Sequence, residues 1–235
     1  MKKLRVDVWS DVVCPWCYVG KRRLEAALAR FPHRDAVEVV WRAFELDPRA
    51  PAAADAGVSH AERLARKYGM SVQQAEQRTR QLTDLAAADG LEFRFDRTRP
   101  GNTFNAHRLL HLAAERGVQD RAKERLLRAY MTEGEPIGDV QALEKLAPEA
   151  GLDAEEARRV LSTDAYAAEV REEEEAAQQI GITGVPFFVI GGRYAVSGAQ
   201  PADILLRALT QAWGDLGEQP IETAEGPVCG PDGCD

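Results

Sequence analysis

The fold of this chain is decided by the stretch Val6-Asp-Val-Trp-Ser-Asp-Val-Val-Cys-Pro-Trp-Cys17. Its first part alternates and is rich in β-branched and aromatic side chains, which predicts a strand over residues 4–9. The pattern is then helical up to about residue 31. It opens on Pro15, which suits a first helical turn because the missing N–H of proline costs nothing there. The two cysteines therefore lie where a strand meets a helix.

This position gives Cys14 and Cys17 a chemical purpose. The first turn of a helix offers unpaired N–H groups and the positive end of the helix dipole, and both stabilise an anion. A cysteine there has a lowered pKa, and the thiolate is the form that attacks disulfides. We expect Cys14 to attack and Cys17, one turn further on the same face, to resolve the mixed disulfide. Pro15 and Trp16 border the nucleophile and are expected to contact the substrate. Half of a zinc site, or two merely buried cysteines, are the alternatives.

The next part of the chain predicts one strand and then a long helical block. Residues 37–44 are rich in β-branched and aromatic side chains, which suit a sheet. From about residue 57 to residue 180 nearly everything is helical, and we expect about five or six helices there. Their starts carry capping residues such as Ser71, with Gln74 three residues later. The alternation of residues 91–95 predicts a short strand-like connector between two of the helices.

The chain then returns to strands. Residues 186–190 and 193–196 predict two short strands, and Gly191-Gly192 between them suits a two-residue hairpin turn. Pro201 opens a last helix that runs to about Trp213. The remaining residues are rich in glycine, proline and acidic side chains, and we interpret them as a tail.

The order of these elements predicts an α/β protein: β-α-β, a helical block, then β-β-α. This is a thioredoxin fold with a large all-helical insertion between its two halves. We place the two halves of the thioredoxin domain at residues 1–55 and 181–214. The helical domain occupies residues 56–180, and the tail occupies residues 215–235.

A second signal lies far from the cysteines, in Gly184-Val-Pro-Phe-Phe188. Proline is tolerated at the start of a strand, so an ordinary edge-strand proline is one interpretation. In thioredoxin folds, however, a loop with a cis proline faces the active cysteines. On that interpretation Val185 and Pro186 bind the substrate, with Val185 offering an open backbone edge to a substrate strand.

Five motifs make the chain resemble DsbA-family oxidoreductases of the FrnE type. The resemblance covers about residues 4–213 and implies a thiol–disulfide oxidoreductase with Cys14, Cys17, Val185 and Pro186 as its active-site set. The motifs are Val6–Gly20, Phe44-Glu-Leu-Asp-Pro48, Asn102-Thr-Phe-Asn-Ala-His-Arg108, Gly184-Val-Pro-Phe-Phe188 and Ser197-Gly-Ala-Gln-Pro201.

Two related groups resemble the chain in layout: glutathione-dependent 2-hydroxychromene-2-carboxylate isomerases and kappa-class glutathione transferases. They typically carry serine in place of the first cysteine, so the presence of both cysteines favours redox chemistry. A glutathione-dependent isomerase or transferase acting on a small aromatic or polyketide-like molecule stays open as an alternative. A redox-gated binding or chaperone module is the second alternative.

A second cysteine pair ends the chain in Cys229-Gly-Pro-Asp-Gly-Cys234. The enclosed residues favour a turn that brings the two sulfurs together. A disulfide across so short a loop stabilises by about 2 kcal/mol on the chain-entropy model, and a crosslink at a chain end would achieve little. We therefore favour an auxiliary redox pair that exchanges electrons with Cys14 and Cys17, and some FrnE-type proteins resemble the chain in this feature. An adventitious or zinc-binding pair is the alternative, although zinc usually takes four ligands.

His107 and His111 are spaced one helical turn apart, as in some metal sites. We expect no metal there, because no glutamate follows His107. The position of His107 within the Asn-Thr-x-x-Ala-His-Arg motif favours a place facing the active-site groove, where it would contact substrate.

Several carboxylates are also candidates. One of Asp7, Asp11 and Glu45 could carry the proton of Cys17 if the predicted fold brings them near, with ordinary solvation as the alternative. The run of glutamates at residues 172–175 predicts a solvated helix face.

The composition limits the kinds of partner and the cellular compartment that we expect for this protein. The chain of 235 residues has a net charge of −8, which argues against nucleic acid and anionic membranes as partners. It has no apolar run suited to a signal peptide or to a membrane span of about 18 residues, so we expect a cytoplasmic protein. We expect no bound cofactor. A disulfide-containing protein or a small thiol is the expected substrate, with glutathione or a thioredoxin-type protein as reductant.

Overall fold

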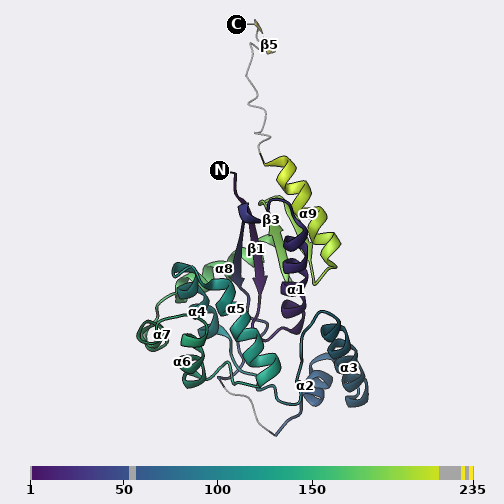
Figure 1. Cartoon of the computed structure of the whole chain (residues 1–235), viewed down its shortest axis with the longest axis vertical. Coiled ribbons are helices and arrows are strands. Elements are labelled where there is room, and N and C mark those ends of the chain that lie inside the picture. The colour runs from purple at the N-terminus through teal and green to yellow at the C-terminus, as the bar shows by residue number, and fades with distance from the viewer. Residues whose placement is uncertain (1, 53–56, 217–228, 231–232, 235) are drawn as a thin grey trace.

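The computed structural model describes residues 2–52, 57–216, 229–230 and 233–234. At its centre is a mixed four-stranded sheet in the order β2-β1-β3-β4 (Figure 1). The strands are β1 (Leu4–Ser10), β2 (Val37–Ala43), β3 (Phe187–Ile190) and β4 (Tyr194–Ser197). β2 runs parallel to β1, whereas β3 is antiparallel to both β1 and β4.

One face of the sheet is covered by α1 (Pro15–Arg30) and α9 (Ala202–Asp215), which pack against each other. Alternate side chains of β1 point to this face, because successive residues of a strand point to opposite sides. Leu4, Val6 and Val8 are completely buried there, together with Phe188 of β3 and Leu205 of α9. The alternation visible in the sequence therefore builds the core of the sheet.

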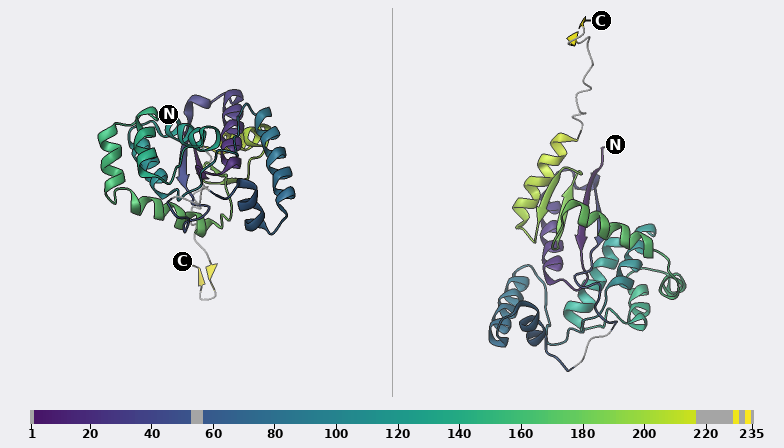
Figure 2. Two further views of the ribbon diagram at one scale, coloured as in Figure 1. Left: turned by 90° about the horizontal axis from the view of Figure 1, so that it is seen from below. Right: turned by 180° about the vertical axis from the view of Figure 1, so that it is seen from behind.

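The other face of β1 is covered by α8 (Ala167–Ile180), as the right panel of Figure 2 shows. Trp9 packs there against Ala177 and Ile182. Its indole N–H donates to the carbonyl oxygen of Glu173 at 3.0 Å. A hydrogen-bonded indole explains why a large amphipathic ring is accepted in this buried layer.

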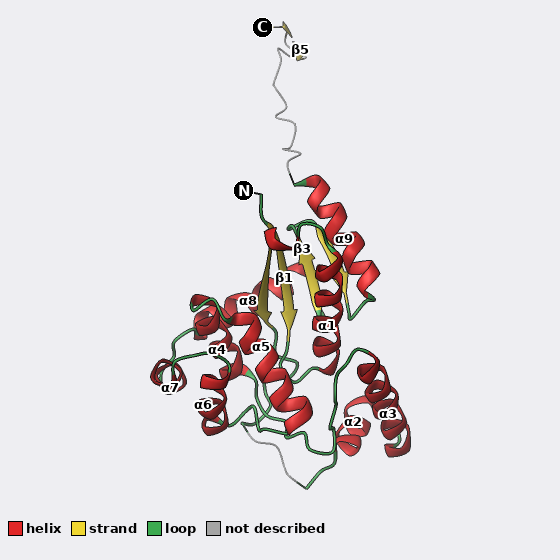
Figure 3. Ribbon diagram, in the orientation of Figure 1, coloured by secondary structure: helices red, strands yellow, loops and turns green. Residues whose placement is uncertain are grey.

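Seven α-helices lie between β2 and β3 in the described part of the chain, more than the sequence predicted. Besides α8 they are α2 (His60–Tyr68), α3 (Val72–Ala88), α4 (Phe104–Glu115), α5 (Gln119–Arg128), α6 (Val140–Glu149) and α7 (Ala154–Ser162), with a π-helix at Ala129–Glu133. Figure 3 shows α2 and α3 on one side of the end toward which β1 runs, and α4–α7 on the other. None of the described helices is long and apolar enough to cross a membrane.

The core of these helices extends under the start of α1. Leu109, Leu112 and Leu127 are buried in it together with Val12 and Val19, which flank the two cysteines. The first half of the sheet domain and the helical block therefore share one hydrophobic core at the strand–helix junction.

Two sequence-based expectations in this region are wrong. Residues 91–95 form no strand, because no neighbouring strand pairs with them; the alternation instead buries Leu91, Phe93 and Phe95 in the helical core. Glu173 does not belong to a solvated face. It is 8% exposed, and its carboxylate accepts the backbone N–H of Ala43 at 2.6 Å.

Glu173 fastens α8 to the sheet. Besides the N–H of Ala43, its carboxylate accepts a hydrogen bond from Arg42 at 2.6 Å and lies 3.2 Å from Nε2 of His111. Removing one member of a buried charged network leaves the others without partners, which is strongly destabilising.

We therefore expect Glu173→Ala to lower the free energy of unfolding by about 3 kcal/mol. The matched control is Glu175→Ala on the same helix, where the residue is exposed and a change within about 0.5 kcal/mol is expected. Urea unfolding of both variants measures the difference. Equal stabilities would show that the contacts of Glu173 do not hold α8 in place.

Candidate active site

Cys14 and Cys17 lie at the start of α1, where the sequence predicted them. Cys14 is the N-cap residue, with φ −91° and ψ 115°, and Pro15 follows in the first helical turn. The N–H of Cys17 donates to the carbonyl oxygen of Cys14 at 3.1 Å. Both residues are free thiols; Cys14 is 4% exposed and Cys17 is completely buried. Only Cys14 is therefore open to a reagent from solvent.

The surroundings of the two thiols shift their pKa values in opposite directions. The pKa of Cys14 is lowered because the thiol of Cys17 donates a hydrogen bond to its sulfur, against the opposing effect of burial. The backbone N–H groups of Cys17 and Trp16 lower it further. The pKa of Cys17 is raised well above that of an ordinary thiol by burial, and also by its hydrogen bond to Cys14 and the charge there. Of the two thiols, Cys14 is therefore the one that loses its proton more readily.

The loop before β3 packs directly against Cys14. The thiol of Cys14 donates to the carbonyl oxygen of Val185 at 3.6 Å, and the Val185–Pro186 peptide bond is cis. The structure therefore brings together the two motifs that the sequence placed at opposite ends of the chain. Within the described residues, this is the only hydrogen bond that Val185 makes.

Gly20 makes this approach possible, and the sequence did not single it out. A Cβ atom on Gly20 would lie 2.8 Å from Cγ of Pro186. Glycine inside a helix costs about 1 kcal/mol relative to alanine. That cost is the sequence signal that could have identified a close contact at this position.

Two apolar side chains are exposed on segments tied to the site. Trp16 stands between the cysteines and is 41% exposed. Leu46 is 37% exposed, and its backbone N–H donates to Oδ2 of Asp11 at 2.8 Å. The sequence analysis did not assign Leu46 to the site, although it lies within the motif of residues 44–48.

A layer of buried polar side chains lies beneath the cysteines. Asp11 is completely buried, and its Oδ1 lies 3.4 Å from Nε2 of His107, which is 1% exposed. His107 therefore does not face the groove, and that prediction is wrong. The reason is that α4 turns His107 into the core, where Asp11 is its partner. Burial raises the pKa of Asp11, but His107, the N–H of Leu46 and the charge of Lys123 together outweigh burial, and the pKa of Asp11 is lowered.

The other two candidate carboxylates are held by arginines. Asp7 accepts a hydrogen bond from Nε of Arg42 at 2.8 Å. Glu45 is 5% exposed and accepts hydrogen bonds from Asn102 at 3.0 Å and from Arg171 at 2.7 Å. The carboxylates of Asp7 and Glu45 are therefore bound by other side chains of the protein and are not simply solvated. Of the three, Asp11 is the carboxylate whose charge acts on Cys14.

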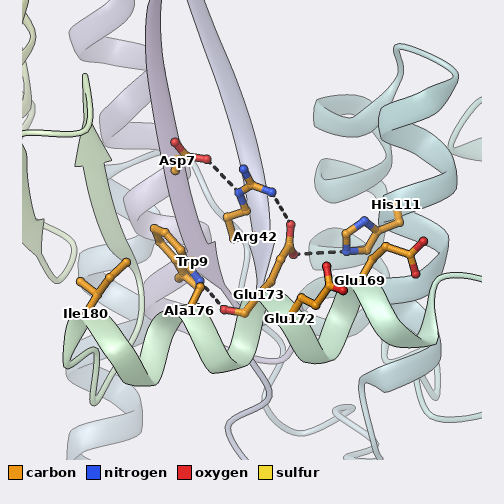
Figure 4. Close-up of a pocket in the computed structure, with 9 residues that line it drawn as sticks. All are labelled: Asp7, Trp9, Arg42, His111, Glu169, Glu172, Glu173, Ala176 and Ile180. Carbon is orange, nitrogen blue, oxygen red and sulfur yellow. Dashed lines mark hydrogen bonds and ion pairs between the residues drawn. The ribbon is translucent and has the colours of Figure 1, made fainter.

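A surface cavity of about 560 Å³ opens beside α8, away from the cysteines (Figure 4). Arg42 bridges Asp7 and Glu173 within it, and His111 points at Glu173. His111 is thus engaged by a carboxylate and does not pair with His107. Among the described residues, no group of three His, Cys, Asp or Glu side chains is arranged to hold a metal ion.

The tail cysteines lie opposite each other in a short antiparallel pair, β5 (Cys229–Gly230) and β6 (Gly233–Cys234). Directly opposed residues of such a pair have Cβ atoms about 4.5–5.5 Å apart. The segment that connects this hairpin to α9 lies outside the described residues, as do the side chains of the hairpin.

The profile of the DsbA-like thioredoxin domain matches residues 5–210. The chain belongs to the DsbA-like thioredoxin family. This match confirms the family, the fold class and the class of enzyme that the motifs predicted, a thiol–disulfide oxidoreductase.

Individual relatives agree with this assignment. The chain is 50% identical to a probable DsbA oxidoreductase of Streptomyces coelicolor, with a TM-score of 0.86 over 99% of this chain and 98% of that one. It is 32% identical to the uncharacterized protein YwbO of Bacillus subtilis, over 88% of this chain and 96% of that protein. The cytosolic disulfide reductase DsbM of Pseudomonas aeruginosa, solved with GSH, shares the fold at 21% identity and a TM-score of 0.61, over 88% of this chain and 98% of that one.

The opposite pKa shifts predict how Cys14 reacts with iodoacetamide as the pH changes. Because only the thiolate is alkylated, a lowered pKa brings the alkylation rate to its plateau at a lower pH than for a free thiol of pKa about 8.5. We expect Cys17→Ala to move this midpoint upward, since Cys14 loses its hydrogen-bond donor. Cys17→Ser keeps a donor and should stay closer to the parent. Mass spectrometry of residue 14 measures the rates, and equal midpoints in all three proteins would contradict this account.

The contact of Gly20 with Pro186 predicts a loss of activity without a loss of folding. Gly20→Ala should improve the helix but push the ring of Pro186 away from Cys14, lowering the rate of disulfide reduction on the order of tenfold to a hundredfold. Gly214→Ala is the control, because that helical glycine has open space around it. A fully active Gly20→Ala protein would show that the loop does not need this approach.

Proposed function

We propose that this protein exchanges disulfides with its substrates through Cys14 and Cys17. One observation carries the proposal. A thiol with a lowered pKa, Cys14, lies 3.6 Å from the carbonyl oxygen of Val185, while its buried neighbour Cys17 keeps its proton. A nucleophile, a resolving thiol and a backbone edge are the three parts that such an exchange needs.

The reaction proceeds in two displacements. The Cys14 thiolate attacks one sulfur of the substrate disulfide, forming a mixed disulfide and releasing the other sulfur as a thiolate. Cys17 then loses its proton and attacks the sulfur of Cys14, which forms the Cys14–Cys17 disulfide and releases the second substrate sulfur. Two electrons pass from the cysteine pair to the substrate, and a reductant such as glutathione or a thioredoxin-type protein returns them.

The surroundings of Cys14 favour an extended polypeptide as the substrate. Val185 makes no backbone hydrogen bond in the described part of the chain, so its edge is available to a substrate strand. The exposed side chains of Trp16 and Leu46 offer apolar contacts. We further propose that the protein works in the cytoplasm, as its relative in fold, DsbM, does by its name.

The tail pair completes the proposal. The register that sets Cys229 opposite Cys234 is compatible with a disulfide between them. We propose that this pair exchanges electrons with Cys14 and Cys17, as a carrier between the active site and an external thiol.

Reduction of insulin by dithiothreitol tests the function. We expect the parent protein to accelerate the reaction, and Cys14→Ser to lower the rate to that of dithiothreitol alone. The double change Cys229→Ser and Cys234→Ser should lower it in part if the tail relays electrons. If the parent is no faster than dithiothreitol alone, protein disulfides are the wrong substrate, and a glutathione-dependent reaction of a small molecule becomes the better hypothesis.

A further inference from the structure

Leu46 stands on a loop after β2 that is held firmly in place. A single exposed leucine is ordinary in a folded protein, but the loop on which Leu46 stands is fixed on both sides of it. The residue before it, Glu45, is 5% exposed and accepts hydrogen bonds from Asn102 at 3.0 Å and from Arg171 at 2.7 Å. Asn102 also donates to the carbonyl oxygen of Pro48 at 3.3 Å. The 37% exposed side chain of Leu46 is therefore presented from a fixed backbone.

The backbone of Leu46 is tied to that of Cys14 through one residue. Asp11 accepts the N–H of Leu46 at its Oδ2, at 2.8 Å, and the N–H of Cys14 at its carbonyl oxygen, at 3.3 Å. With ordinary bond lengths inside the aspartate, the nitrogens of Leu46 and Cys14 are at most about 12 Å apart. The side chain of Leu46 therefore lies within reach of the residue next to a substrate sulfur at Cys14.

The sheet places Leu46 and Val185 on opposite sides of the chain that leads from β1 to Cys14. β2 and β3 flank β1, and the register sets Ala43 and Phe187 beside the end of β1 that runs into the cysteines. Leu46 follows Ala43, whereas Val185 precedes Phe187. Neighbouring strands lie about 4.8 Å apart. A substrate strand that pairs with Val185 and has its sulfur at Cys14 therefore continues toward Leu46.

We propose that Leu46 selects the substrate by the side chain that flanks its reacting cysteine, on the side away from Val185, and favours an apolar side chain there. This inference rests on the proposed function. A leucine on a fixed loop gains contact with an apolar neighbour at little cost in ordering, because the loop has already lost its freedom. A polar neighbour would lose part of its hydration against the leucine. The expected substrates are polypeptides in which an apolar residue adjoins a cysteine of the disulfide.

Peptides whose single cysteine is joined to nitrothiobenzoate through a disulfide measure this selection. The Cys14 thiolate attacks the peptide sulfur, the bond between the two sulfurs of the reagent breaks, and nitrothiobenzoate leaves with the electron pair as a coloured thiolate, since the thiol of lower pKa leaves faster. The peptides carry leucine, glutamine or glutamate either before or after the cysteine. All proteins carry Cys229→Ser and Cys234→Ser, so that only the active-site thiols remain.

The attack of mercaptoethanol on the same peptides gives the reference ratio of their rates without a binding site. Relative to it, we expect the parent to react about tenfold faster with the leucine peptide than with the glutamine peptide, at one flanking position only. Leu46→Gln should abolish this preference. Leu46→Lys should favour glutamate over glutamine at the same position, because opposite charges attract. The comparison of two peptides on one protein cancels any change in the reactivity of Cys14.

Ile180→Gln is the matched control. Ile180 is also an exposed aliphatic side chain, at 51%, but it lines the cavity that lies away from the cysteines (Figure 4). This variant should keep the preference of the parent. Thermal unfolding of each variant identifies one that fails to fold, and Leu46→Ala, which also removes most of the apolar contact, then takes the place of Leu46→Gln.

Three results would overturn the inference. The first is an equal relative rate for the leucine and glutamine peptides in the parent, and the second is a preference that persists in Leu46→Gln. The third is the same preference at both flanking positions, which would assign it to Trp16, the exposed ring between the cysteines. If the parent releases nitrothiobenzoate from every peptide no faster than Cys14→Ser does, the proposed function itself is refuted.

Discussion

The antiparallel pairing of β1 with β3 is the constraint on which the site depends. It sets Trp9 opposite Phe187, so that Pro186 arrives where β1 ends and the cysteines begin. The thiol of Cys14 then meets the carbonyl oxygen of Val185. Apolar burial of β1 against α1 and α9 holds this register, because a shift by one residue would turn Leu4, Val6 and Val8 away from these two helices.

The sequence predicted the parts of the fold whose signals are local. Strand β1, the start of α1 and the β3–β4 hairpin each have a period or a turn that identifies them, and the cysteine pair lies within one such signal. Gly20 is different, because its role depends on Pro186. That residue is remote in the sequence and comes near Gly20 only when the chain folds.

Buried charges were the main features that the sequence did not reveal. Glu173 and Lys123 both stand in strongly charged helices, where the usual interpretation is a solvated face. Their burial is decided by the partners they meet: the N–H of Ala43 for Glu173 and the carbonyl oxygen of Ser10 for Lys123. The residue pattern of α5 or α8 cannot predict these partners, because Ser10 lies on β1 and Ala43 lies on β2.

The helical insertion therefore does more than enlarge the protein. By burying Val12 and Val19 in its own core, it closes off Cys17 from water and raises the pKa of that thiol through burial. The buried thiol of Cys17 in turn donates the hydrogen bond that lowers the pKa of Cys14. Packing and chemistry at this site are consequences of one arrangement, the docking of α4 and α5 beneath the first turn of α1.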